Sequence, residues 1–366
     1  MTRTVLSVLT RRMFLVQDLW AASTVPPMET YMRVTCYGPR GSIPAPSRKG
    51  RHGKPDFRTD EFGGNTSCYL IEAGPFRIIL DMGSGILVCG DDLLRSHNGV
   101  GKDFIVLLSH FHWDHIQGGP FSVPLFIGSN RFHFHGFAPA GQESTVPFER
   151  SVEAVLVDQQ DAPNFPVAHA AMPSQKFYNA HHFQFSETFT YFCHENGKYE
   201  RLATQMIGQA HETLPADVRN ELHRWVKITT IPLNHPNGCL GFAVEYMGEK
   251  VVYCTDNEPL LFLNAQITKH AKDADWLLLD GQYTAEQLAG MQQTFGHGTP
   301  RNCVDQAKAA GAKFLVIHHH DPRHDDATLR LMEEDARAYA MEIDFQGFVE
   351  FAREGTVYPI GDGDAH

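Results

Sequence analysis

The sequence predicts one mixed α/β domain. Three observations support this: strand-like runs dominate the first part of the chain, strands alternate with helices near its end, and histidine or aspartate side chains follow several apolar strands. Strands followed by βα units are typical of one α/β core rather than of two independent domains. We therefore expect a leader at 1–31, one domain at 32–361 with an insertion at about 120–226, and a short tail at 362–366.

Apolar, β-branched runs bounded by Gly, Pro, Asn or Asp indicate the strands of this domain. Helical periodicity is clearest at 301–311 and 325–340. Residues 120–226 are less regular, with many prolines and one helix-like segment near 211–225, and we interpret them as an insertion. In chain order the expected strands lie at 31–37, 67–72, 77–81, 104–108, 227–232, 240–246, 250–255, 276–280 and 313–317.

The charge balance limits the partners that the chain can have. With 31 Lys and Arg against 43 Asp and Glu, the formal net charge is −12. Binding to nucleic acid or to an anionic membrane requires clustered Lys and Arg that displace counterions. We therefore expect no nucleic-acid duplex, no tRNA and no membrane as partners, whereas a small anionic substrate is compatible with local positive charge. The sequence leaves a homodimer open.

The cysteines and the N-terminal residues bear on location. The seven cysteines are scattered and never form a CxxC pair, a usage that suits reduced thiols in a cytoplasmic protein. The arginine pair at 11–12 resembles a twin-arginine export signal, but Gln17 and Asp18 interrupt the apolar stretch behind it. A flexible leader or an over-extended start fits residues 1–31 better, because Met28 and Met32 precede the first clear strand.

The stretch HFHWDH at 110–115 places three histidines and one aspartate in six positions. In an extended chain residues i and i+2 share a face, so His110 and His112 can bind the same ion. Asp114 and His115 lie just beyond, where a turn brings them to a second ion. Imidazole and carboxylate donors without thiolate suit Zn²⁺, Mn²⁺ or Fe²⁺.

Further donors lie just after the C-terminal ends of apolar strands. His110 comes after FIVLL, His235 after ITTIPL, Asp256 after VVYCT and His319 after KFLVI. The loops at the C-terminal ends of strands in an α/β sheet converge on one site. Scattered surface residues would not follow such a rule, so we expect these side chains to meet.

HFHWDH resembles the HxHxDH signature of the metallo-β-lactamase superfamily, whose fold is an αββα sandwich of two mixed β-sheets flanked by helices. The likeness continues through GPRGS at 38–42, GGNTSC at 63–68, LDMGSG at 80–85, NHP at 234–236, TDN at 255–257, GHGT at 296–299 and HHDP at 319–322. The resemblance implies two divalent ions as cofactors, zinc first and manganese or iron as alternatives. The ligands that it implies are His110, His112 and His235 for one ion, Asp114, His115 and His319 for the other, and Asp256 as a bridge.

The choice within His318-His319-His320 rests on the family spacing to the following proline, which favours His319 as the ligand. Alternation along the chain places His318 and His320 on the opposite face. Asp81 is expected to orient ligands rather than to bind metal itself.

The remaining histidines receive a simpler interpretation. His133 and His135 form another HxH pair, but no DH follows it, so we interpret them as ordinary strand or loop residues. His181, His324 and several others are expected at the surface.

The expected site is that of a hydrolase. Two ions about 3.5–4 Å apart can share a hydroxide, bring its pKa near neutrality and hold the attacking and leaving oxygens of a displacement. The superfamily also includes β-lactamases, thioesterases and lactonases, so the fold does not choose the substrate. β-Lactamases of this fold usually carry a cysteine where this chain has Asp256, which disfavours lactam hydrolysis.

GHGTP at 296–300 favours phosphodiesters. Thr299 is a good N-cap and Pro300 a good first helical residue, so His297 is expected beside a helix N-terminus, which attracts anions. A histidine so placed can protonate an alkoxide leaving group. The element resembles GHST of the phosphodiesterase branch, which includes ribonuclease Z and phosphoribosyl 1,2-cyclic phosphate phosphodiesterase. The resemblance implies that His297 is the general acid and joins Asp114 as a catalytic residue, with glycine in place of the usual serine.

Substrate contacts are expected from Tyr283, in DGQYT at 280–284, and from Arg40, Arg301 and Arg323, unless these arginines are solvated surface groups. Residues 187–220 mix acidic and basic side chains, so they do not form the basic arm with which ribonuclease Z grips tRNA. We therefore expect a binuclear phosphodiesterase that acts on a small phosphodiester, cyclic ones included. The alternative is a metal-dependent carboxyl-ester, lactone or thioester hydrolase of the same fold.

Overall fold

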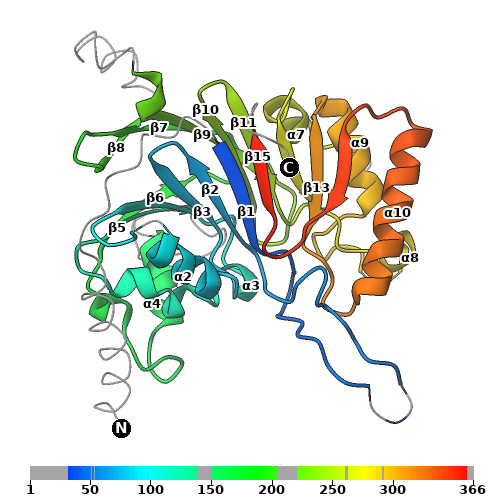
Figure 1. Cartoon of the computed structure of the whole chain (residues 1–366), viewed down its shortest axis with the longest axis horizontal. Coiled ribbons are helices and arrows are strands. Elements are labelled where there is room, and N and C mark those ends of the chain that lie inside the picture. Colours follow the sequence, from blue (N-terminus) through cyan, green and yellow to red (C-terminus); the bar gives the residue numbers. More distant parts are fainter. Residues whose placement is uncertain are drawn as a thin grey trace.

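Two β-sheets pack face to face between two groups of helices (Figure 1). The structure is a computed structural model that describes residues 32–50, 52, 54–96, 98–137, 151–203, 221–259, 263–290 and 292–360. The expected leader and tail lie outside these residues. None of the helices in the described ranges has the length and apolarity that a membrane crossing requires.

The first sheet is antiparallel at one edge and parallel at the other. Its first three neighbouring pairs, β15–β1, β1–β2 and β2–β3, are antiparallel, and the pairs from β3 to β6 are parallel. The strand order is β15 (Val357–Ile360), β1 (Met32–Gly38), β2 (Cys68–Ala73), β3 (Phe76–Leu80), β4 (Asp103–Leu107), β5 (Arg131–Phe137) and β6 (Gln175–His181).

The second sheet has the complementary arrangement. Strands β11 to β14 are parallel neighbours, whereas β10, β9, β7 and β8 continue the sheet as antiparallel pairs. The order is β14 (Phe348–Phe351), β13 (Phe314–His318), β12 (Trp276–Asp280), β11 (Glu249–Cys254), β10 (Cys239–Tyr246), β9 (Trp225–Leu233), β7 (Thr188–Cys193) and β8 (Tyr199–Ala203).

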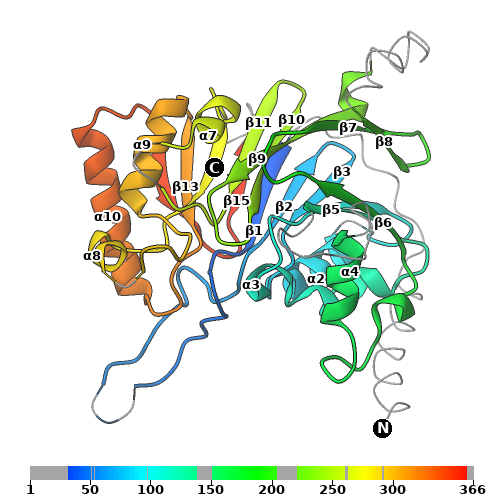
Figure 2. The same cartoon turned by 180° about the vertical axis from the view of Figure 1, so that it is seen from behind.

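Helices cover the outer face of each sheet, as both views show (Figures 1 and 2). The first sheet carries α2 (Ile86–Ser96), α3 (Trp113–Ile116) and α4 (Ser151–Gln159). The second sheet carries α7 (Ala265–His270), α8 (Ala285–Ala289), α9 (Pro300–Ala310) and α10 (Asp326–Glu342). Short 3₁₀ turns lie at Gly119–Phe121, Val123–Phe126, His169–Ala171 and Leu222–Arg224.

Buried side chains form three apolar layers that match this arrangement. One layer lies between the sheets and includes Ile105, Phe242 and Leu278. A second lies under α2 and α4, and a third lies under α7, α9 and α10. Because each layer joins two neighbouring slabs of secondary structure, the fold is the four-layer αββα sandwich that the sequence predicted.

Each of the nine predicted strands is present, within a few residues of its expected bounds, and so are both predicted helices. Thr299 caps α9 as expected: its hydroxyl accepts from the Asn302 N–H, and the Asn302 side chain bonds back to Thr299. This reciprocal capping fixes where α9 begins and therefore where the preceding GHGT loop ends.

The segment 120–226, which we expected to be an insertion, contributes β5 and β6 to the first sheet and β7 and β8 to the second. These four strands, together with β14 and β15, were not predicted. Of the helix expected near 211–225, residues 211–220 lie outside the described ranges, and the remainder is a 3₁₀ turn at Leu222–Arg224 followed by β9.

Strand β5 was missed because histidines alternate with phenylalanines in RFHFHGF, and histidine is usually a poor indicator of a buried face. Here the histidine face is buried between the sheets. His135 lies 2.9 Å from His181 and 2.8 Å from the Tyr191 hydroxyl. The surface location expected for His181 and His324 is therefore wrong, since both are buried. Partners within the fold replace the water that a surface histidine would have.

Leu278→Ala is expected to lower the free energy of unfolding by about 2–5 kcal/mol, because Leu278 is fully buried between the sheets and its loss leaves a cavity. Urea denaturation followed by circular dichroism measures the change. Leu331→Ala on α10 is the matched control, since that side chain is 67% exposed and should cost less than about 0.5 kcal/mol. Equal losses in the two variants would contradict this view of the core.

Candidate metal centre

Five of the seven expected ligands lie in loops just past the end of a strand, and Asp114 and His115 lie in α3, directly after the first of these loops. β4 leads into His110, β9 into His235, β11 into Asp256 and β13 into His319. The first sheet supplies residues 110–115 and the second sheet supplies the others. The centre is therefore assembled at the edge where the loops of the two sheets meet.

His110, His112, His235 and Asp256 form one cluster of donor atoms. The His112 Nδ1 lies 3.1 Å from the His235 Nε2. The Asp256 Oδ2 lies 3.4 Å from the His110 Nε2 and 3.5 Å from the His235 Nε2. Within the described residues the His110 Nε2 is buried and has no hydrogen-bond partner. Burial also lowers the pKa of His110, which keeps the neutral form that binds metals.

Asp114, His115 and His319 form a second cluster beside the first. The His319 Nε2 lies 3.2 Å from both the His115 Nε2 and the Asp114 Oδ2. The Asp256 Oδ1 lies 3.1 Å from the His319 Nε2 and 3.3 Å from the His115 Nε2. Asp256 thus presents one carboxylate oxygen to each cluster.

The donor set fits divalent metal ions. A tetrahedral ion with bonds of about 2.0–2.1 Å keeps its ligand atoms about 3.3 Å apart, close to the distances within both clusters. Burial alone would raise the pKa of Asp114, but the neighbouring His115 and His319 lower it far below its usual value. The carboxylate is therefore charged and ready to bind a cation.

The second nitrogen of several of these imidazoles is held by a neighbour, which orients the ring. The His115 Nδ1 lies 2.8 Å from the Asp81 Oδ2, and the His319 Nδ1 lies 3.0 Å from the Gln282 Oε1. The His235 Nδ1 lies 3.0 Å from the Gly296 carbonyl oxygen. The DGQYT and GHGT stretches therefore position histidines of the two donor clusters, a role that we had not assigned to Gln282 or to Gly296.

Asp81 has the orienting role that we expected. Its carboxylate also accepts hydrogen bonds from the Ser109 N–H, the Ser109 hydroxyl and the Tyr253 hydroxyl. It is fully buried and has a positive φ of 58°. Asp256 and His319 also have positive φ values, of 34° and 62°. Such backbone conformations are uncommon outside glycine and cluster at functional sites.

Asp81→Asn is expected to weaken metal affinity by about 10–100-fold, because the amide cannot accept all the hydrogen bonds that hold His115. Asparagine tolerates a positive φ, so the backbone should be retained. Competition with a chelator measures the affinity. Asp158→Asn, at an exposed position on α4, is the control, and equal affinities in the two variants would contradict the orienting role.

Close approach to histidine rings explains two glycines of the motifs. A Cβ on Gly41 would overlap the ring of His319, and a Cβ on Gly296, where φ is 93°, would overlap the ring of His235. The GPRGS and GHGT loops therefore pack directly against the imidazoles of His319 and His235.

Only one histidine of 318–320 faces the centre. The ring of His318 packs against Tyr69 and Tyr253, and the Nε2 of His320 is bonded to the Ala352 carbonyl oxygen. The geometry thus agrees with the choice of His319.

His297 lies at the rim of the centre. Its ring is stacked on that of His319 at 5.0 Å, and its Nδ1 lies 2.8 Å from the Asp280 Oδ2. Burial alone would lower the pKa of His297, but Asp280, with help from Asp256 and Asp114, raises it to about 9. The imidazole therefore carries its proton at neutral pH. Asp280 was missed, although it too ends an apolar strand.

The expected substrate contacts divide into two groups. Arg40 is fully buried and donates to the carbonyl oxygens of Gly63, Asp321 and His324. It ties loops together, so its assignment as a substrate contact is wrong. Arg301 is paired with Asp335 across α9 and α10, which also turns it away from the centre.

Tyr283 and Arg323 remain near the site. The ring of Tyr283 lies 5.5 Å from that of His297. Burial raises the pKa of the Tyr283 hydroxyl, with help from Asp321 and Asp280, and the Arg323 charge opposes this shift. Arg323 is paired with Asp321, but its side chain is 67% exposed.

Known proteins resemble this chain in both sequence and fold. The family model described as the beta-lactamase superfamily domain matches residues 180–320. The resemblance to the metallo-β-lactamase superfamily that the sequence indicated is confirmed by this match and by the relatives and structures below. A ribonuclease Z from Agathobacter rectalis is 27% identical over 276 residues, which cover 70% of this chain and 86% of that protein.

Solved structures of the superfamily have the same fold. The crystal structure of the metallo-β-lactamase fold protein YhfI from Bacillus subtilis has a TM-score of 0.54 at 18% identity and covers 91% of this chain and 100% of that one. Human short-form tRNase Z has a TM-score of 0.53 at 16% identity and covers 90% and 99%. The protein is a metal-dependent hydrolase, as the sequence predicted.

One expectation about partners is contradicted. We expected no tRNA and no nucleic-acid duplex as a partner, but relatives of this chain are named ribonuclease Z and tRNase Z. The expectation rested on the net charge of the whole chain and on the mixed charges of residues 187–220. Net charge averages over the surface and does not exclude a local basic cluster.

Proposed function

We propose that the chain is a binuclear metal phosphodiesterase. The observation that carries the proposal is the placement of Asp256, whose two carboxylate oxygens face two separate clusters of donors. A site for one ion would not require both oxygens to be aimed apart. Zinc is the proposed metal because nitrogen and oxygen donors at tetrahedral spacing suit it, with manganese or iron as alternatives. The ligands are His110, His112 and His235 for one ion, Asp114, His115 and His319 for the other, and Asp256 between them.

The residues around the proposed ions would donate a proton to the leaving group and stabilise the anionic substrate. When bound, two divalent ions lower the pKa of water towards neutrality and offset negative charge on phosphoryl oxygens. Asp280 holds the Nδ1 of His297, which leaves the Nε2 of His297 to donate a proton to the leaving oxygen. The N-terminus of α9 begins at Pro300 and favours an anionic group beside His297.

Exposed apolar side chains border the centre and favour a substrate with a flat, apolar face. Trp113, between two expected ligands, is 64% exposed. Phe295, next to Gly296, is 54% exposed, and Ile43, next to Ser42, is 60% exposed. The Ser42 N–H donates to Asp114, so this loop borders the centre too. Nucleobases stack well on such side chains.

The scissile group is therefore a phosphodiester of a nucleotide or nucleotide-like molecule. The relatives named ribonuclease Z support a ribonucleotide substrate. A small or cyclic diester presents the same reacting group and is the simplest substrate of the proposed site. The cytoplasm is the proposed location, because all seven cysteines are buried free thiols.

The test is a substrate panel. Metal-stripped protein is reconstituted with Zn²⁺ or Mn²⁺ and assayed with bis(p-nitrophenyl) phosphate, cyclic nucleotides, sugar cyclic phosphates, a short RNA and acyl esters. We expect metal-dependent cleavage of phosphodiesters. Cleavage of RNA but not of the small diesters would show that the substrate is a polynucleotide. Activity on acyl esters alone would overturn the proposal in favour of the acyl hydrolase.

A further inference from the structure

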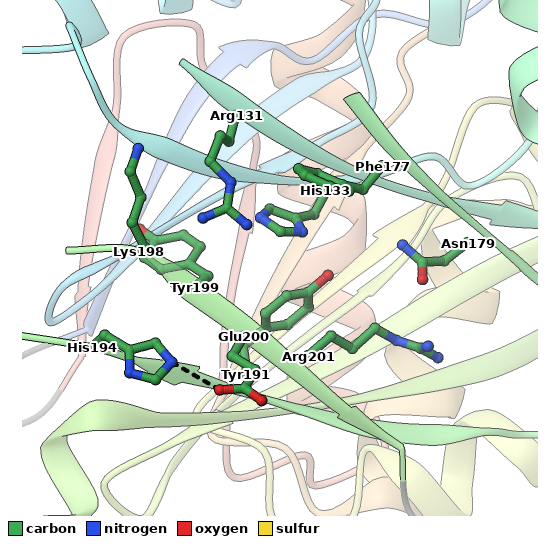
Figure 3. Close-up of a pocket in the computed structure, with 10 residues that line it drawn as sticks. All are labelled: Arg131, His133, Phe177, Asn179, Tyr191, His194, Lys198, Tyr199, Glu200 and Arg201. Carbon is green, nitrogen blue, oxygen red and sulfur yellow. Dashed lines mark hydrogen bonds and ion pairs between the residues drawn. The ribbon is translucent and has the colours of Figure 1, made fainter. Parts of the chain in front are cut away.

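A hollow of about 460 Å³ opens between the outer strands of the two sheets, away from the metal centre (Figure 3). Arg131 and His133 of β5 extend from one sheet towards Tyr191 and Tyr199 of the other. We propose that this hollow binds the phosphate and base of a nucleotide.

The hollow and the metal centre lie at opposite ends of β4. That strand starts at Asp103, which is paired in register with Arg131, and runs towards His110. The stretch from Asp103 to His110 corresponds to roughly 20 Å of extended chain. The hollow is thus a separate site, and one nucleotide bound there does not reach the proposed ions.

Positive charge gathers in the hollow around one buried carboxylate. Asp103 is fully buried at its side chain and accepts from Lys198 at 3.1 Å, from the Tyr199 N–H at 2.8 Å and from His133 at 3.3 Å. Arg131 lies 3.3 Å from the same carboxylate. One carboxylate offsets only one of the two cations, so the floor of the hollow keeps a positive charge.

A third cation adds to this excess. Arg201 is exposed, and its guanidinium lies 5.2 Å from the Phe189 ring. No carboxylate in the described part of the chain pairs with it. The acidic side chain that does line the hollow, Glu200, is bonded to His194 at 2.8 Å. The side chain of Arg131 keeps 23% of its surface exposed although it faces Asp103, so it remains accessible to a phosphate in the hollow.

A flat aromatic face lies beside these cations. Phe177 of β6 is 40% exposed, and the Arg131 guanidinium lies 5.0 Å from its ring. The ring of His133 stacks on Phe177 at 5.0 Å and holds it in place. A base can stack on the exposed part of Phe177 while its phosphate meets Arg131 and Arg201. The volume exceeds what a phosphate ion needs and lies in the range of small-molecule sites.

Linear sequence did not reveal this cluster because its members are far apart in the chain. Arg131 belongs to the first sheet, whereas Lys198 and Arg201 belong to the β7–β8 hairpin of the second. Counting charges over 187–220 therefore omitted Arg131 and included Glu187 and Glu195, which do not line the hollow.

Isothermal titration calorimetry of the metal-loaded full chain tests the proposal with AMP, adenosine and inorganic phosphate as probes. AMP should bind at least about tenfold more tightly than either fragment, because only AMP makes both the stacking and the phosphate contacts. Its affinity should fall as salt is added.

Variants locate the site. Arg201→Glu and Phe177→Ala should each weaken AMP binding by about tenfold or more. Arg95→Glu is the matched control for charge, since that arginine is 72% exposed on α2, on the outer face of the first sheet. Equal AMP binding in the wild type and in Arg201→Glu would overturn the proposal, and so would a wild type that binds neither AMP nor a short oligoadenylate.

Two further measurements distinguish a free nucleotide from a nucleotide within RNA, and the hollow from the metal centre. If a short oligoadenylate binds the wild type but not Arg201→Glu, and AMP does not bind, the hollow takes a nucleotide within an RNA chain. Hydrolysis of bis(p-nitrophenyl) phosphate should be unchanged in Arg201→Glu. If the wild type lacks this hydrolysis but binds AMP through Arg201, the nucleotide site stands and the proposed phosphodiesterase fails.

Discussion

Asp256→Asn is expected to lower kcat for phosphodiester hydrolysis by more than about 100-fold and to reduce the metal content of the purified protein. The two carboxylate oxygens of Asp256 lie 3.1–3.5 Å from four imidazole nitrogens in two clusters. Asparagine keeps the shape but loses the charge and one acceptor. Because groups that merely orient ligands already contribute about 10–100-fold, a group that faces both ions should contribute more.

Elemental analysis and steady-state kinetics on the same samples measure this effect. Asp158→Asn on α4 removes the same charge at an exposed position and should leave both values unchanged. Circular dichroism reports whether the fold is retained. A folded Asp256→Asn variant with two ions per chain and normal kcat would show that Asp256 does not join two metals.

The strands of this fold were predictable where the buried residues form continuous aliphatic runs in the sequence. The strands β4, β12 and β13 are buried on both faces or nearly so, and their sequences, FIVLL, WLLLD and KFLVI, contain little else. β5 and β6 are equally part of the sheet, yet polar and aromatic side chains fill their inner faces. Their burial depends on partners from β7 and β8, which only the folded structure brings together.

The ligands were predictable for a different reason: each follows the end of a strand that is itself easy to identify. What the sequence could not supply is how the neighbouring side chains point. Gln282 and Asp280 lie in the DGQYT motif at 280–284, but their contacts with His319 and His297 depend on the loop conformation. Arg40 shows the converse, because its charge suggested a phosphate contact and its burial among carbonyl oxygens excludes one.

His297→Ala is expected to affect substrates according to their leaving groups. On a cyclic nucleotide or a short RNA, whose leaving group is a poor alkoxide, kcat should fall by about 10²–10⁴-fold. On bis(p-nitrophenyl) phosphate the loss should stay within about tenfold, because nitrophenolate departs without a proton. Parallel kinetics on the two kinds of substrate measure the difference.

Asp280→Asn should show the same pattern to a smaller degree, since the Asp280 carboxylate holds the Nδ1 of His297 and favours its protonated form. His270→Ala is the control, because that histidine ends α7 shortly before β12 begins, at the end of the second sheet away from the centre. Equal losses on both kinds of substrate in His297→Ala would assign His297 to positioning of the phosphate or of His319. A loss of kcat confined to substrates with alkoxide leaving groups requires a proton donor at this position. His297 can supply that proton, because the Asp280 carboxylate holds its Nδ1.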